Sequence, residues 1–97
     1  MFKSVRMDNV LTIVVAGRFD GSLAPDVHAA LDAAVNSGVD HIVVDLCDAT
    51  EVDDGAIAVL AAAASRTVGA GGRLFIALGP EHVVQIHDAS LVRSVFG

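Results

Sequence analysis

The hydrophobic pattern of the chain alternates between short apolar runs and longer stretches with helical spacing. Short runs rich in Val, Ile and Leu are typical of β-strands. Four such runs predict strands over residues 2–7, 10–16, 41–46 and 73–78. Between the first two runs, Asp8-Asn9 predicts a two-residue turn, so that these strands form a hairpin.

Two stretches repeat apolar residues at the spacing of an amphipathic helix. The first helix is expected to begin near Ala24, with Pro25 at an early helical position, and to stop at Asn36-Ser37-Gly38. The second is expected over residues 55–68 and to stop at the glycine-rich segment 69–72.

The remaining segments predict loops and a third helical region. Loops are expected at 17–22 and at the acidic segment 47–53. A short helix is expected from Gly79 to about His87, with a last helical turn over 91–96. This order predicts a single α/β domain over residues 1–97. It has a mostly parallel sheet of about four strands, an antiparallel N-terminal edge hairpin and helices packed on the sheet.

Composition narrows the class of protein. The chain has 97 residues, 54% of them hydrophobic and 19% charged, which excludes an intrinsically disordered chain and fits one small domain. Cys47 is the only cysteine, so no internal disulfide forms, and we expect a small buried thiol there. No apolar run reaches the roughly 18 residues of a membrane span, and no signal peptide is recognisable, so we expect a cytoplasmic protein.

The charge distribution argues against binding to nucleic acid. Twelve acidic and six basic residues give a net charge of −6, and the bases are scattered along the chain. Half of the acids lie between residues 40 and 54, namely Asp40, Asp45, Asp48, Glu51, Asp53 and Asp54. Such a stretch is either a solvated loop or a surface for a basic partner or a cation, and the sequence leaves both open.

The segment from Val52 to Leu60 lies where a predicted strand ends and a predicted helix begins. Loops at the carboxyl ends of parallel strands are where α/β folds place their binding sites. The free N–H groups of the first helical turn favour an anionic group, so Asp53 or Asp54 is expected to act as the N-cap.

At this point the chain resembles a STAS domain of the bacterial anti-sigma-factor antagonist type. The resemblance covers nearly the whole chain, and the order and spacing of several segments carry it. These segments are the opening hairpin, Gly17-Arg18-Phe19-Asp20, the run HIVVDL at 41–46, the Asp53 loop, Gly71-Gly72-Arg73-Leu74, and residues 86–91.

The central loop of that family typically reads Asp-Ser-Ser/Thr-Gly-Leu-Gly. Asp53 falls on the family Asp, and Asp54 falls on the Ser that an anti-sigma-factor kinase phosphorylates. Ala56 and Ala58 replace two glycines. The resemblance therefore implies that this chain is not switched by phosphorylation at position 54. Asp54 is either a built-in mimic of the phosphorylated state or a neutral helix cap, and the sequence leaves both open.

The resemblance also implies a protein-binding surface. Asp20 aligns with an acidic position beside the family phosphoacceptor, and with Asp53 and Asp54 it forms either a carboxylate cluster or three solvated acids, of which the second is favoured. Gly55, Ala58 and Ala62 share one helical face, where small side chains allow a partner to approach closely. Good helix formation explains the alanines equally well.

These features together indicate a binding module. No catalytic, metal-ligating or cofactor motif accompanies the carboxylates, so we expect neither an enzyme nor a cofactor. The resemblance implies an anti-sigma factor with a histidine-kinase-like ATPase fold as the partner. The alternative is a STAS regulatory or scaffold subunit of a lipid ABC transporter or stress-signalling complex. The sequence also leaves a homodimer open.

Overall fold

A computed structural model describes residues 1–96 of the chain. The elements along it are β1 (Phe2–Met7), β2 (Val10–Phe19), α1 (Ala24–Asn36), β3 (His41–Val52), α2 (Asp54–Gly69), β4 (Arg73–Gly79), β5 (His82–Ile86) and α3 (Ala89–Phe96).

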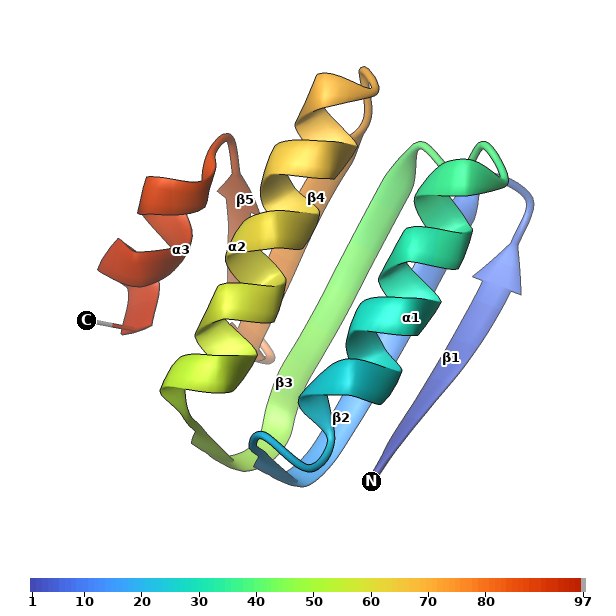
Figure 1. Cartoon of the computed structure of the whole chain (residues 1–97). Coiled ribbons are helices and arrows are strands. Elements are labelled where there is room, and N and C mark those ends of the chain that lie inside the picture. The colour runs from blue at the N-terminus through green and yellow to red at the C-terminus, as the bar shows by residue number, and fades with distance from the viewer. Residues whose placement is uncertain (97) are drawn as a thin grey trace.

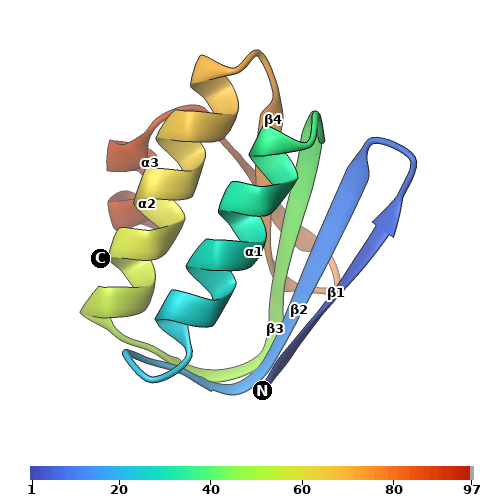
Figure 2. The same cartoon turned by 45° about the vertical axis from the view of Figure 1, so that its right-hand side comes forward.

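One five-stranded sheet has its strands in the order of the chain, β1-β2-β3-β4-β5. The three central strands are parallel to one another, and β1 and β5 flank them as antiparallel edges. α1 and α2 lie side by side on one face of the sheet, and α3 packs against α2 (Figures 1 and 2). The predicted α/β class, with helices packed on the sheet and an N-terminal edge hairpin, is confirmed.

The hydrophobic core lies between the sheet and the helices. Alternate residues of each central strand point toward the helices, as the two-residue period of a strand requires. Residues of this set are Leu11, Ile13, Val15, Ile42, Val44, Leu74 and Ile76, and all of them are buried. The helices contribute Val27 and Leu31 from α1 and Leu60 from α2.

The predicted hairpin turn at Asp8-Asn9 is confirmed. Met7 pairs directly with Val10, which leaves two residues in the turn. Asp8 has a φ of 56° and so lies in the left-handed region. Asp tolerates that region better than most residues, because its short polar side chain bonds locally, although Gly is the usual choice.

The short helix expected after Gly79 is wrong. Residues 82–86 form β5, which pairs antiparallel to β4, and only Pro80 and Glu81 separate the two strands. The adjacent β-branched pair Val83-Val84 favours a strand, and Ile86 pairs with Leu74 and is buried. The sheet therefore has five strands instead of about four.

The expected loop at 47–53 is almost entirely strand, and the expected loop at 17–22 is half strand. β2 continues to Phe19 and β3 to Val52, because these two ends pair with each other in the parallel register. The register shifts between Val14 and Ala16 and again between Gly17 and Arg18, and at each shift β3 has one additional residue. Cys47 lies at the first of these shifts and is exposed, so the expected buried thiol is wrong.

Candidate functional site

The predicted site is built where β2 and β3 end together. Phe19 and Val52 are register partners, and the Asp53 N–H donates to the Phe19 carbonyl over 3.1 Å. This link brings the loop before α1 against the loop before α2. Both loops lie at the carboxyl ends of parallel strands, the edge where the sequence places the site.

Asp53 joins the two loops with its side chain. It is the N-cap of α2, and its Oδ1 accepts a hydrogen bond from the Ala56 N–H over 2.9 Å. Its Oδ2 accepts from the Gly21 N–H over 3.1 Å. The expectation that an aspartate caps this helix is thus confirmed for Asp53. Because both oxygens are engaged by main-chain N–H groups, this half-buried carboxylate positions the site.

Asp54 lies differently from its neighbour. It is the first residue of α2 and is exposed. In the described chain its side chain has no hydrogen bond to another residue. Its negative charge stands in the first turn of the helix, where the helix dipole favours it. Asp54 therefore presents a free carboxylate to solvent, and its equivalence to the family phosphoacceptor stays a prediction from the resemblance in sequence.

Asp20 turns toward its own loop. Its Oδ1 accepts from the Ser22 hydroxyl over 2.6 Å and from the Ser22 N–H over 3.0 Å. The Ser22 hydroxyl, followed by that N–H, holds the pKa of Asp20 below its ordinary value of 3.8, because both bonds favour the charged carboxylate. Within residues 1–96, no group of three or more His, Cys, Asp or Glu is arranged to hold a metal ion.

The exposed face of α2 continues from this loop. Gly55, Ala58 and Ala62 are all exposed, as their shared helical face requires. The buried side of α2 is formed instead by Ala56, Leu60, Ala61, Ala63, Ala64 and Thr67. The three small residues therefore form a shallow surface beside Asp54. We call Asp54, Gly55, Ala58 and Ala62 the α2 surface.

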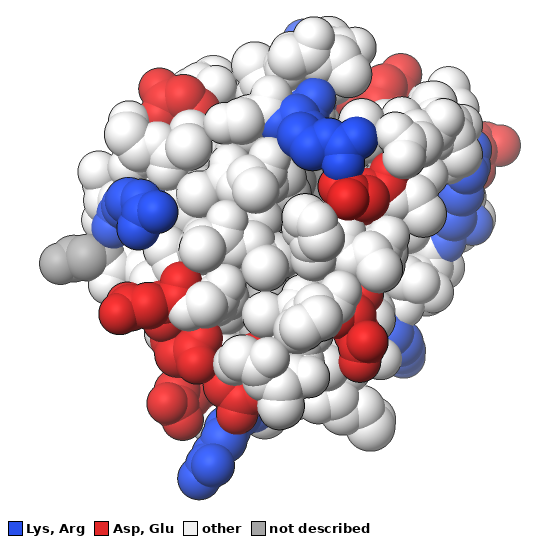
Figure 3. Space-filling view, in the orientation of Figure 1, with Lys and Arg blue, Asp and Glu red and all other residues white. Residues whose placement is uncertain are grey.

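Acidic side chains gather near the beginning of α2. Figure 3 shows red atoms at the lower left, over the start of that helix, and mostly white atoms over its exposed face. The other acids of the 40–54 stretch do not join one cluster. Asp45 accepts from the Cys47 N–H over 2.9 Å, and Glu51 lies 3.7 Å from Arg18. Extension of β3 spreads them along the strand.

Arg66 shows how the far end of α2 is fixed. Its guanidinium donates to the carboxylate of Asp32 and, over 3.1 Å, to the side chain of Asn36, both on α1. Sequence reasoning assigned Arg66 no such role, since the spacing between the two helices is not visible locally. α1 and α2 are therefore tied together at the solvent side, which keeps the α2 surface in a fixed orientation.

A family model described as "Mlab, STAS domain" matches residues 3–93. The chain belongs to the STAS domain family. A search of curated proteins finds no match. In the described residues, no helix has the length and hydropathy to cross a membrane.

Two solved structures share this STAS fold. The anti-sigma factor antagonist SpoIIAA in its unphosphorylated form superimposes with a TM-score of 0.73 at 14% identity, covering 78% of this chain and 71% of SpoIIAA. A protein named Mglu superimposes with a TM-score of 0.68 at 21% identity. That match covers 84% of this chain and 20% of Mglu, so this chain spans about a fifth of its length.

Proposed function

We propose that this STAS domain is a protein-binding module of the anti-sigma-factor antagonist type. In this proposal it binds an anti-sigma factor with a histidine-kinase-like ATPase fold and so regulates the availability of a sigma factor. It acts in the cytoplasm and by binding, without catalysing a reaction. The likeness of its fold to an anti-sigma factor antagonist supports the proposal, as does the family to which the chain belongs.

The observation that carries the proposal is the contrast between Asp53 and the α2 surface. Asp53 uses both oxygens to hold the loops together. Asp54, Gly55, Ala58 and Ala62 are left exposed beside it. A surface of small side chains next to one free carboxylate lets a partner's backbone approach closely and supplies one charge for recognition. Asp53 supports this surface through its bonds to Ala56 and Gly21, and Asp20 bonds Ser22 in the neighbouring loop.

Asp54 is proposed to make the module independent of phosphorylation at this position. A carboxylate carries one negative charge, whereas a phosphoserine carries about −1.5 to −2. It also lacks the hydroxyl that a serine kinase phosphorylates. Regulation through this loop would then depend on the amount of the protein and its partner.

The test begins with affinity purification of the tagged protein from its own cells. The ATPase that is captured is then purified and titrated calorimetrically with the wild type, Ala58→Arg and Ala62→Arg. We expect each Arg to weaken binding about tenfold or more, because a long charged side chain blocks close approach. Ala29→Arg, at an exposed alanine of α1, is the matched control and should bind like the wild type.

Two results would contradict the proposal. Unchanged affinity of both α2 variants, in folded protein, would exclude the α2 surface. Capture of an ABC transporter ATPase in place of an anti-sigma factor would favour the transporter alternative.

The role of the Asp54 charge is tested separately, with the variants Asp54→Ser and Asp54→Ala in the same titration. Tighter binding by Asp54→Ala would show that the native carboxylate mimics a phosphorylated state, and equal binding would show a neutral first-turn acid.

A further inference from the structure

The face of the sheet opposite the helices has no cover in the described chain. Its side chains alternate along each strand with those of the core, and Figure 2 shows the helices gathered on the other side. Four large apolar residues on this open face are well exposed: Val5 by 48%, Met7 by 71%, Val10 by 39% and Val83 by 55%. The face is mixed, since Lys3, Thr12, His41, Asp45 and Arg73 lie on it as well.

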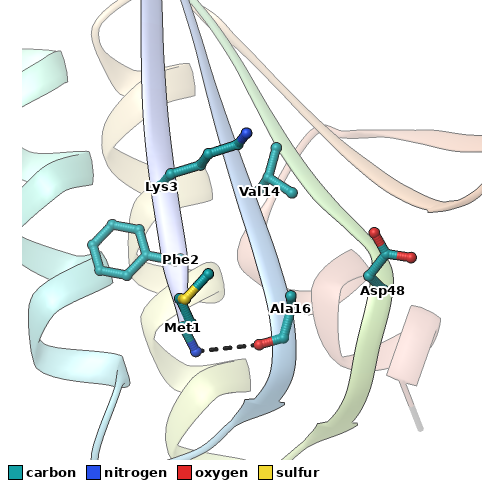
Figure 4. A pocket seen from close by; sticks show the side chains of 6 residues that line it. All are labelled: Met1, Phe2, Lys3, Val14, Ala16 and Asp48. Carbon is teal, nitrogen blue, oxygen red and sulfur yellow. Dashed lines mark hydrogen bonds between the residues drawn. The ribbon is translucent and has the colours of Figure 1, made fainter.

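Strand register places two opposite charges at the same height on this face. Lys3 of β1 pairs with Val14 of β2, and Val14 pairs with Asp45 of β3. Lys3 and Asp45 therefore flank Val14 from either side, about 10 Å apart across two strand spacings. Figure 4 shows Lys3 beside Val14 on one side of the sheet, whereas Phe2 points to the other side.

Neither charge is neutralised by an ion pair within the copy. The salt bridges of residues 1–96 join other residues, namely Arg18 to Glu51, His28 and Arg66 to Asp32, and His41 to Asp40. Lys3 and Asp48 also border a hollow of about 250 Å³, whose other lining residues are Met1, Phe2, Val14 and Ala16 (Figure 4). The second acid, Asp48, adds negative charge on the β3 side of Val14.

We propose that the open face binds a second copy of this chain, with a two-fold axis that runs along β2. Such an axis exchanges the β1 side of one copy with the β3 side of the other. It places Lys3 of each copy over Asp45 of its partner, so that one interface contains the ion pair twice. Packed sheets lie about 10 Å apart, a distance that a lysine side chain and an aspartate together can span.

The same axis brings part of the apolar set together: Val10 lies over its own symmetry mate, whereas Met7 faces His41 and Val83 on β5 lies beyond the three overlapping strands. By register, Val5 of one copy faces Val43 of the other, and the outer residues of β2 face one another. An axis along β3 would instead place Asp45 over its own symmetry mate, which like-charge repulsion disfavours. An axis across the strands through Thr12 would bring Lys3 over Met7 and leave its charge unpaired. Charge complementarity therefore selects the axis along β2.

This surface is separate from the α2 surface, and the inference does not rest on the proposed function. The test is sedimentation equilibrium of the purified chain from micromolar to millimolar concentration. We expect a monomer–dimer equilibrium in the wild type. Lys3→Glu and Asp45→Lys should each weaken the dimer about tenfold or more, because each turns both symmetric ion pairs into like-charge contacts. The double variant Lys3→Glu/Asp45→Lys should restore it.

Matched controls reverse charges elsewhere. Arg93→Glu on α3 and Asp26→Lys on α1 change the net charge equally and should leave the dimer unchanged. A wild type that stays monomeric throughout would overturn the proposal, as would a dimer that ignores the Lys3 and Asp45 variants.

Asp45→Lys also removes the hydrogen bond from the Cys47 N–H, which could by itself disturb β3. A second measurement therefore tests the axis without that variant. Val14→Cys in a Cys47→Ser background places a thiol on the axis, and a short bismaleimide should cross-link it to its own symmetry mate. Val68→Cys on α2, in the same background, is the control and should give no cross-linked dimer. Absence of cross-linking at position 14 would overturn the proposed axis.

Discussion

The two ends of the parallel strands are held together by different kinds of group. At the amino end the links are main-chain bonds. The Asn9 carbonyl accepts from the Asp40 and His41 N–H groups, both over 3.1 Å, and the Asp40 carbonyl accepts from the Arg73 N–H over 2.8 Å. At the carboxyl end both links between the loops come from Asp53: its N–H donates to the Phe19 carbonyl, and its side chain accepts from the Gly21 N–H. One residue therefore controls the shape of the candidate site, whereas the opposite end depends on backbone fit.

The largest effect is expected at the amino end, for Gly72→Ala. A Cβ atom on Gly72 would lie 2.7 Å from the Asp40 carbonyl oxygen, which is itself bonded to the Arg73 N–H. The backbone must shift to relieve this contact, and we expect the free energy of unfolding to fall by about 2–3 kcal/mol. Urea denaturation measures it.

Gly69→Ala is the matched control, since nothing lies within 4 Å of a Cβ placed there. Gly69 is the last residue of α2, so alanine there should be neutral or slightly stabilising. Equal stability of the Gly72 and Gly69 variants would contradict the view that close backbone approach fixes the amino end.

The next effect is expected at the carboxyl end, for Asp53→Ala. The variant loses the helix cap and the link to Gly21, and we expect about 1–2 kcal/mol lower stability. Amide hydrogen exchange should quicken at Gly21 and Ala56. Asp54→Ala, which removes an equal charge but no loop contact, should cost only a few tenths of a kcal/mol. A similar loss from both variants would show that charge, and not the link, holds this end.

A smaller change of opposite sign is expected for Asp8→Gly in the hairpin turn at the amino end. Asp8 has a φ of 56°, which glycine adopts without steric cost. The added flexibility of the unfolded chain offsets part of this relief, so we expect a gain of about 0.5 kcal/mol or less. A rise in the thermal midpoint checks it, and a fall would show that the Asp8 side chain stabilises the turn.

The smallest effect is a shift in titration at the carboxyl end. Ser22→Ala should raise the pKa of Asp20 toward 3.8, because the hydroxyl bond that favours the carboxylate is lost. Because the pKa of Asp20 is lower in the folded state than in the unfolded state, Asp20 stabilises the fold at any pH above its ordinary pKa. This contribution is lost as the pH falls through the pKa of the folded state. The two proteins should therefore converge in stability in acid. NMR titration of the carboxyl carbon measures the pKa.

Asp88 provides an internal control for that titration. The Ser90 hydroxyl bonds its carboxylate over the same 2.6 Å, and that bond, with the Leu91 N–H, lowers the pKa of Asp88. Ser90→Ala should raise the pKa of Asp88 and leave Asp20 unchanged. Movement of both carboxyls in either variant would point to a general change in the fold.

Local pattern predicted the elements whose signals are contained within a few residues. The turn at Asp8-Asn9, the stop of α1 at Asn36-Ser37-Gly38 and the aspartate cap of α2 are of this kind. β5 was missed because Gly79-Pro80-Glu81 also fits the start of a helix, while the strand depends on pairing with β4. The sequence does not predict the last residues of β2 and β3, because these residues form strand only where they pair with each other.

The candidate site was predictable to a similar degree. Sequence and resemblance placed Asp20, Asp53 and Asp54 near one another, and Gly55, Ala58 and Ala62 on one exposed helical face. They did not separate the roles of the three acids, since the bonds of Asp53 to Gly21 and of Asp20 to Ser22 depend on how the loops meet. The contribution of these residues to partner binding stays a prediction.

The order of strands in the sheet has a consequence for how the chain folds. Because that order is the chain order, every strand after β1 pairs with the strand that precedes it in the sequence. The entropy of loop closure is small for the two antiparallel pairs, which close across two-residue turns, whereas each parallel pair closes across a helix, so the parallel pairings should limit the folding rate. On the ribosome the sheet can grow one strand at a time, and the β5 edge is added last.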